Sequence, residues 1–297
     1  MQIATTLFYD MAATRMTTLT SRANVLQTQI ATGKRVQSAS EDAALAQQVA
    51  EFDRKDADTA VYQTNLTLAG SQLTQADSVL GDMTAQLQRA QELAIQASNG
   101  TQTPASRRLI GVEMAAIVDA LVGLANTKNL RGQPLFGTPD GTDAVTNNGA
   151  GGFSFATTTV APIPIGTGQS VEATEDAGRI FNYDKTTGTS TLSMLSMLAA
   201  TLSMGDAPDP ATLDALNAAG DKISLVQASV GARGARVELQ QSQLTAASVD
   251  RAALRSSVED VDITTSVAEL QKIMTVLSAT QASFSKLSGL SLFDYLR

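Results

Sequence analysis

The chain offers few side chains for chemistry, because it has neither cysteine nor histidine. Disulfides, thiolate zinc sites, cysteine nucleophiles and histidine-dependent triads are therefore excluded. Ser283 and Lys286 have the S-x-x-K spacing of acyl-enzyme hydrolases. No Ser-Asp-Asn or Lys-Thr-Gly motif accompanies them, and they lie within an apolar repeat. The sequence favours a packing role over catalysis and predicts that the protein is not an enzyme.

A phosphate loop and a cation site are the other chemical alternatives. The run 32–35 (TGKR) resembles part of a phosphate loop, but Thr28 stands where the leading glycine belongs. A glycine C-cap of a helix explains this run better. The carboxylates Asp140 and Asp143, and those in 259–262, lack the spacing of a calcium loop. We expect the group at 259–262 to cap the following helix, whose dipole favours negative charge, and we expect no cofactor and no metal.

Charge and hydropathy limit the partners and the compartment. The net charge is −8 and no block of Lys or Arg occurs, which argues against nucleic-acid binding. The most apolar long stretch, 109–125, is interrupted by Glu113 and Asp119, so it is too charged to span a bilayer. The first 22 residues lack the basic start and apolar run of a cleavable signal, so secretion would need another route.

Both ends of the chain carry the steps of four and three residues that define a coiled-coil seam. The first seam runs from Ala12 to Ile30, and the second from Ile263 to Phe284. Ile273 and Leu287 widen the second stripe, which predicts a helix that touches more than one neighbour. We expect these helices to be stable only against each other and against other subunits. The candidate packing residues are Met16, Leu19, Leu26, Ile30, Ile263, Val267, Leu270, Met274, Leu277, Phe284 and Leu287.

Longer helices are predicted inside the two ends. A capping box at Ser38 and Glu41 opens one that continues to about Ser98, roughly 85 Å at 1.5 Å per residue. Thr103-Pro104 begins a helix that ends near Asn129, and helix returns at about Thr191 and again after Asp209-Pro210. Leucines and other apolar residues recur every seven residues in two of these segments: Leu66, Leu73, Leu80 and Leu87, then Leu216, Ile223, Val230, Val237 and Leu244.

The middle of the chain differs in composition. From Gly132 to Gly188 it is rich in Gly, Thr, Pro, Asp and Asn, which predicts a small strand-and-loop domain. We therefore expect a mainly α fold: a long antiparallel coiled-coil or helical-bundle rod made from both chain ends, with a small β-rich outer domain inserted in the middle. The predicted division is terminal coiled-coil helices at 1–35 and 260–297, a long-helix bundle at 36–131 and 189–259, and the outer domain at 132–188.

Gly231 and Gly234 interrupt the last long helical pattern. In a helix interior, each glycine lowers stability by about 1 kcal/mol relative to alanine. Close packing against another backbone is the ordinary reason for such a pair, and a hinge is the alternative.

Several segments resemble the flagellin superfamily, in the same order along the chain. IATGKRVQSASEDAALAQQVAEF (30–52) is similar to the stretch after the first terminal helix, and GLANTKNLRGQPLFGT (123–138) to the segment leading into the outer domain. VGARGARVE (230–238) and VEDVDITTSVAELQK (258–272) resemble the returning helices. The ending SGLSLFDYLR (288–297) is similar to that of FlgL-type hook-associated proteins.

This resemblance implies a structural protein of the bacterial flagellum, located outside the cell where hook meets filament. It would self-associate in a ring beside the hook-associated protein FlgK and flagellin, after export through the flagellar type III apparatus with the chaperone FlgN. It implies a role in motility. From the charge and hydropathy given above, we expect no nucleic-acid partner and no membrane insertion. Three alternatives remain open: a flagellin of the filament itself, a hydrolase using Asp140 or Asp143 in the central region, and a cytoplasmic coiled-coil signalling protein.

Overall fold

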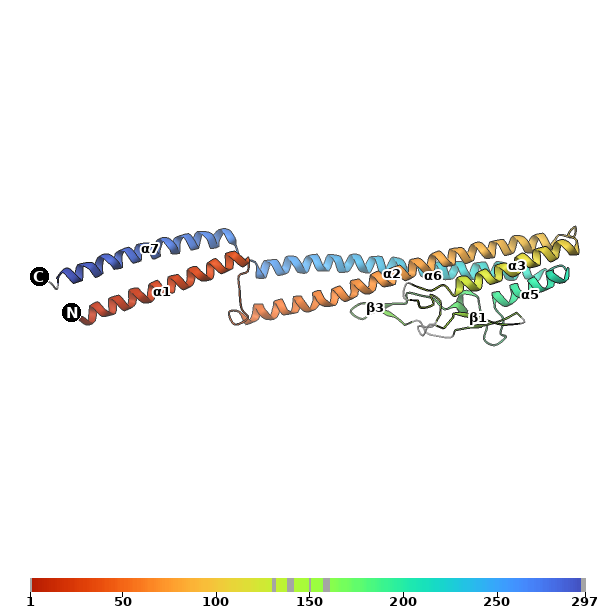
Figure 1. Ribbon diagram of the computed structural model, residues 1–297, viewed down its shortest axis with the longest axis horizontal. Coiled ribbons are helices and arrows are strands. Elements are labelled where there is room, and N and C mark those ends of the chain that lie inside the picture. Colours follow the sequence, from red (N-terminus) through yellow and green to blue (C-terminus); the bar gives the residue numbers. More distant parts are fainter. Residues whose placement is uncertain (1, 130–131, 138–141, 150, 157–160, 295–297) are drawn as a thin grey trace. The chain divides into compact units, whose positions relative to one another are not determined.

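A computed structural model describes residues 2–129, 132–137, 142–149, 151–156 and 161–294, and it is mainly α-helical (Figure 1). It confirms the mainly α fold class with a small β region. The chain divides into two compact units, one formed by 1–57 with 247–297 and the other by 58–246. No helix in the described part of the chain is both long and apolar enough to cross a membrane.

The unit 58–246 is built on helices whose apolar residues repeat every seven positions. It contains most of α2 (Ala43–Ser98) and of α6 (Ala211–Glu259), with α3 (Pro104–Ala125) and α5 (Thr191–Met204). Both predicted heptad repeats form its core, since the side chains of Leu66, Leu80, Leu87, Leu216, Ile223 and Val230 are almost fully buried. Small residues between them, such as Ala69, Ala76 and Ala90, are fully buried as well, so the helices approach closely.

Two predicted helix boundaries were wrong, each for a local reason. The helix α2 begins at Ala43 because Asp42 caps it: its Oδ1 accepts the Leu45 N–H at 3.0 Å. The Ser38–Glu41 pair instead closes a turn before the helix, where the Ser38 hydroxyl donates to Glu41 Oε1 at 3.1 Å.

The helix α3 begins as predicted, with Thr103 as N-cap and Pro104 at the first position. It ends at Ala125 rather than near 129, because the Asn126 side chain binds the backbone of Val145 in β1. The Asn126 Nδ2 donates to the Val145 carbonyl at 2.8 Å, and the Val145 N–H donates to Asn126 Oδ1 at 2.9 Å. A side chain that pairs with a strand in this way fixes the point where the chain leaves the helix.

The central β-rich region consists of two hairpins and one short helix. The strands β1 (Val145–Gly149) and β2 (Gly152–Phe155) pair antiparallel, as do β3 (Ile163–Gly166) and β4 (Gln169–Val171). The four-residue helix α4 (Ala177–Ile180) follows them. The buried side chains Phe153, Ile165 and Phe181 join the core of the helices, beside which the hairpins lie in Figure 1.

Gly231 and Gly234 lie in an uninterrupted α6, and the expected backbone contact is absent. A Cβ built at either position would meet nothing within 4 Å. Within the described chain, neither glycine is therefore required by close packing. A groove of about 440 Å³ lies beside them between α2 and α6, with Leu66, Leu73 and Val237 among its walls.

Candidate interaction surface

The helices α1 (Gln2–Thr32) and α7 (Ile263–Asp294) pack along each other in the unit 1–57 with 247–297. Their shared core is small: Ala23, Leu26 and Ile273 are buried, with Leu19 and Leu270 partly buried against them. Towards the chain ends, the rings of Tyr9 and Phe284 meet edge to face, with centroids 5.3 Å apart. An exposed ion pair joins Arg22 to Glu269 at 3.0 Å.

The structure places the predicted packing residues at different depths. Leu26 is buried; Met16, Leu19, Ile30, Val267, Leu270, Leu277 and Phe284 are half-buried; Ile263 and Met274 are exposed; the side chain of Leu287 lies outside the described residues. On α7 the face toward α1 is centred on Ile273, one residue away from Met274. Whether these residues pack against another subunit stays a prediction.

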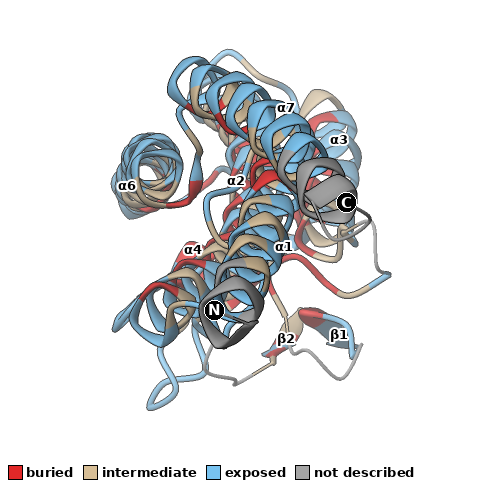
Figure 2. Ribbon diagram, turned by 90° about the vertical axis from the view of Figure 1, so that its left-hand side faces the viewer, coloured by how far each residue is buried: buried red, intermediate tan, exposed pale blue. Residues whose placement is uncertain are grey.

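Most of the described residues of these two helices are exposed or partly exposed (Figure 2), and large apolar side chains are among them. On α1, Leu7 is 59% and Met11 is 49% exposed. On α7, Ile263 is 53% and Met274 is 47% exposed, although both fall on the predicted seam. Among the described side chains of these helices of 31 and 32 residues, three apolar ones are buried between them, which gives little internal stabilisation. Their outward apolar stripes form a surface suited to bind further helices.

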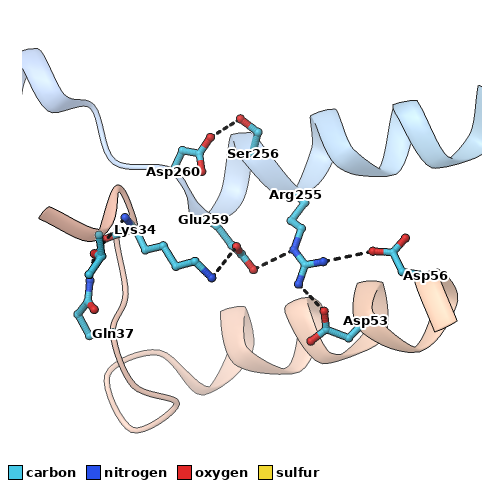
Figure 3. Close-up of polar contacts among 9 residues, drawn as sticks. Lys34, Gln37, Asp53, Asp56, Arg255, Ser256, Glu259 and Asp260 are labelled. Atoms are coloured by element: carbon cyan, nitrogen blue, oxygen red, sulfur yellow. Dashed lines mark hydrogen bonds and ion pairs between the residues drawn. The ribbon is translucent and has the colours of Figure 1, made fainter. Parts of the chain in front are cut away.

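A cluster of ion pairs fastens the turn between α6 and α7 to α2 and to the α1–α2 connection (Figure 3). Arg255 on α6 contacts Asp53, Asp56 at 3.2 Å and Glu259 at 3.3 Å. Lys34 reaches Glu259 at 3.3 Å, and the Glu259 side chain is only 11% exposed. A network in which every charge is paired costs less to bury than isolated charges would.

Backbone hydrogen bonds reinforce this cluster. The Arg35 N–H donates to the Glu259 carbonyl at 2.7 Å, and the Val261 N–H donates to the Gly33 carbonyl at 2.9 Å. Gly33 has φ +71°, the left-handed C-cap conformation predicted for the 32–35 run. A second guanidinium, that of Arg251, contacts Asp56 at 2.5 Å. The connection after α1 is thus held to the residues that precede α7.

Hydrogen bonding to Asp53 is the main reason that the pKa of Arg255 lies above its ordinary value, and the charges of Glu259 and Asp53 add to it. At the start of α7, hydrogen bonds from the Thr265 hydroxyl and backbone N–H lower the pKa of Asp262. Asp262 therefore caps α7 as expected, with its Oδ1 accepting the Thr265 N–H at 3.1 Å. Glu259 does not cap α7, because it ends α6 and its carboxylate is used by Arg255 and Lys34.

These groups do not form a catalytic arrangement. A cavity of about 270 Å³ lies beneath the α1–α2 connection, but its charged residues Lys34, Asp53 and Glu259 are all committed to ion pairs. Asp143 lies 4.0 Å from Lys128, and Asp140 is outside the described residues. Over the described part of the chain, acidic side chains form no cluster that could hold a metal ion.

Two sets of paired charges stand out among those that the sequence did not predict. One is the cluster around Arg255, and the other joins the β-rich region to α6, where Arg233 contacts the buried Glu175 at 2.5 Å. Arg233 also donates to the carbonyls of Glu172 and Thr174, at 3.0 and 2.9 Å. Its place in the VGARGARVE motif was the available signal, but its partner lies 58 residues away.

The helical segments at both ends of the chain match known protein families. Residues 3–139 match the bacterial flagellin N-terminal helical region, and residues 213–296 match the bacterial flagellin C-terminal helical region. The chain belongs to the bacterial flagellin family. Members of this family are structural components of the flagellum, so the chain is a structural flagellar protein and not an enzyme.

Relatives within the flagellin family include both filament and hook-associated proteins. Flagellin of Listeria innocua is 28% identical over 88% of this chain and 86% of its own. Flagellar hook-associated protein 3 of Escherichia coli is 25% identical, and the match covers 90% of each chain. The flagellar junction protein FlgL of Legionella pneumophila shares the fold, with TM-score 0.58 and 15% identity over 73% of this chain and all of that one. These similarities agree with the predicted FlgL-like character and with assembly in the flagellum.

Proposed function

We propose that this flagellin-family chain forms the junction between hook and filament, as a ring of self-associated copies. The observation that supports assembly is the α1–α7 pair, whose internal core is small and whose outward apolar side chains are exposed. The SLFDYL ending favours the junction over the filament, and the similarity to hook-associated protein 3 over 90% of each chain is compatible with it.

The position in the flagellum is tested by immunogold labelling with an antibody against residues 132–188. The expected result is a single band where hook meets filament. Label along the whole filament would identify a filament subunit, the alternative that the Listeria flagellin similarity favours. Intact flagella without label would contradict both roles.

The assembly surface is tested by replacing an exposed apolar residue of α7 with a charged one. Met274→Glu should leave the helix content of the monomer unchanged, because the side chain is 47% exposed. It should abolish motility in a strain that lacks the wild-type gene, because a carboxylate would be desolvated at the interface. Ala279→Glu is the matched control, since Ala279 is exposed on the same helix away from Met274 and from the α1-facing Ile273. Normal motility of the Met274→Glu strain would refute this surface.

The proposed neighbours are FlgK on the hook side and flagellin on the filament side, and the proposed export route is the flagellar type III apparatus with the chaperone FlgN. The apolar stripe of α7 is the segment that a chaperone would have to cover before assembly. Native gels of the full chain with purified FlgN should show a complex that Met274→Glu weakens and Ala279→Glu does not. If both variants form the complex equally well, FlgN does not bind through this apolar stripe.

A further inference from the structure

A pocket of about 290 Å³ lies in the unit 58–246, where the end of β2 and the turn after α4 meet α6. It is remote in sequence from the terminal helices, and the proposed junction role makes no use of it. Its lining combines cationic, aromatic and amide side chains, and polar groups of these kinds fix the orientation of a bound ligand.

The charge of this pocket is positive although the chain as a whole carries −8. Arg179, Lys185 and Lys222 line it. Arg179 is paired with Glu175 at 2.7 Å, whereas Lys185 and Lys222 form no ion pair with any described carboxylate. Asp176 is the acidic residue of the lining, and its Oδ1 accepts the Gly178 N–H at 3.0 Å as the cap of α4. Two ammonium groups are thus available to an anion.

The pocket also offers an aromatic surface and neutral polar groups. The rings of Phe155 and Tyr183 lie 4.6 Å apart with 32° between their planes, and Phe155 is buried while Tyr183 is partly exposed. Asn182 has φ +50°, and within the described part of the chain no other residue except glycine has a positive φ. This conformation ends α4, where the Tyr183 N–H donates to the Gly178 carbonyl at 2.8 Å, and it places the Asn182 side chain in the pocket lining. The Asn182 amide and the Tyr183 hydroxyl can both donate and accept hydrogen bonds.

We propose that this pocket binds a carboxylated monosaccharide, a hexuronic acid. The two lysines supply charge-assisted hydrogen bonds to the sugar carboxylate. The partly exposed ring of Tyr183 attracts the C–H edge of the sugar through its negative face. The Asn182 amide and the Tyr183 hydroxyl form hydrogen bonds with the sugar hydroxyls. A simple anion would use only the lysines, and a neutral hexose would use only the ring and the polar groups. A hexuronate uses all of them.

The test is saturation-transfer NMR on the full chain with glucuronate, glucose and acetate. Glucuronate should bind with a dissociation constant of about 1 mM, and glucose and acetate more weakly. The double variant Lys185→Gln, Lys222→Gln should weaken glucuronate binding about tenfold, as expected for the loss of charge-assisted contacts. Arg108→Gln, which removes one exposed cation from α3 outside this pocket, should leave glucuronate binding unchanged.

Three outcomes would overturn the proposal. These are no transfer from the wild-type chain to glucuronate, equal binding of acetate and glucuronate, and unchanged binding by a double variant that keeps the far-ultraviolet circular dichroism of the wild type. None of them bears on the position of the protein in the flagellum, because the labelling experiment does not depend on this pocket.

Discussion

Replacing the two α6 glycines with alanine should stabilise the monomer. In an exposed helix interior, glycine is less favourable than alanine by about 1 kcal/mol, because it loses more backbone entropy on folding. A Cβ at Gly231 or Gly234 meets nothing within 4 Å, so no steric cost opposes this gain. The double variant Gly231→Ala, Gly234→Ala should therefore raise the free energy of unfolding by about 2 kcal/mol.

Gly111 in α3 provides the matched control, because its surroundings are crowded. A Cβ there would lie 2.9 Å from the backbone nitrogen of Ser203 and 3.0 Å from the carbonyl of Ala199, so α3 and α5 would have to separate. Gly111→Ala should lower the free energy of unfolding by about 1–3 kcal/mol, as overpacking of a core does, despite the better helix propensity of alanine.

Urea unfolding followed by far-ultraviolet circular dichroism measures both effects, with the midpoint shifting in opposite directions for the two variants. If the α6 double variant is destabilised, the glycines must serve a contact or a bend within the monomer, and the reasoning from open space is refuted. If Gly111→Ala is as stable as the wild type, the contact between α3 and α5 is looser than the structure indicates.

Three further changes test the terminal unit. Arg255→Met should lower the free energy of unfolding by roughly 2 kcal/mol, because the nearly buried Glu259 carboxylate loses one of its two ion-pair partners. Arg54→Met removes an exposed pair and should lower it by less than about 0.5 kcal/mol, as measured by urea unfolding. Leu26→Ala should lower the free energy of unfolding by about 2 kcal/mol and increase the rate of proteolysis in α1, because the buried side chain is lost. Val25→Ala, at an exposed neighbouring position, should leave the proteolysis rate unchanged. The lowered pKa of Asp262 contributes stability that is present above its unfolded-state pKa and lost as the pH falls through its folded-state pKa. Asp262→Asn, which still caps but does not titrate, should reduce the acid-induced loss of helicity in a pH titration; an unchanged acid transition would contradict this role.

The long helices were predictable from the sequence because their signals are local. Leu66, Leu73, Leu80 and Leu87 repeat every seven residues, and this periodicity alone indicates which side of α2 is buried. The start of α3 was equally predictable, because Thr103 and Pro104 act on the backbone next to them. Where the determining group lies within a few residues, the sequence carries enough information.

Features that depend on distant partners could not be predicted in the same way. The end of α3 is set by Asn126 binding Val145, 19 residues further on. The contact of Arg251 with Asp56 spans 195 residues. Acidic pairs on α2 and arginines four residues apart on α6 are visible in the sequence, but nothing local indicates that they meet.

The face of α7 that contacts α1 was ambiguous for a geometric reason. Leu270, Leu277 and Phe284 belong equally to a stripe through Met274 and to one through Ile273. The repeat does not choose between these adjacent stripes, and only the contact with Leu26 and Ala23 places Ile273 inside. Two overlapping stripes on one helix are also what a helix needs in order to pack against more than one neighbour.

The two units thus differ in how completely they bury their own hydrophobic side chains. In the unit 58–246, the heptad residues of α2 and α6 are buried against each other and against the β-rich region, so this unit has a core of its own. In the α1–α7 pair, three of the described apolar side chains are buried and several large ones stay exposed. Such a pair gains most of its stability when it joins other helices, because burial of its outward stripes then adds to a weak internal core. We therefore expect folding of the terminal helices to be coupled to assembly, in line with the role proposed for this flagellin-family chain.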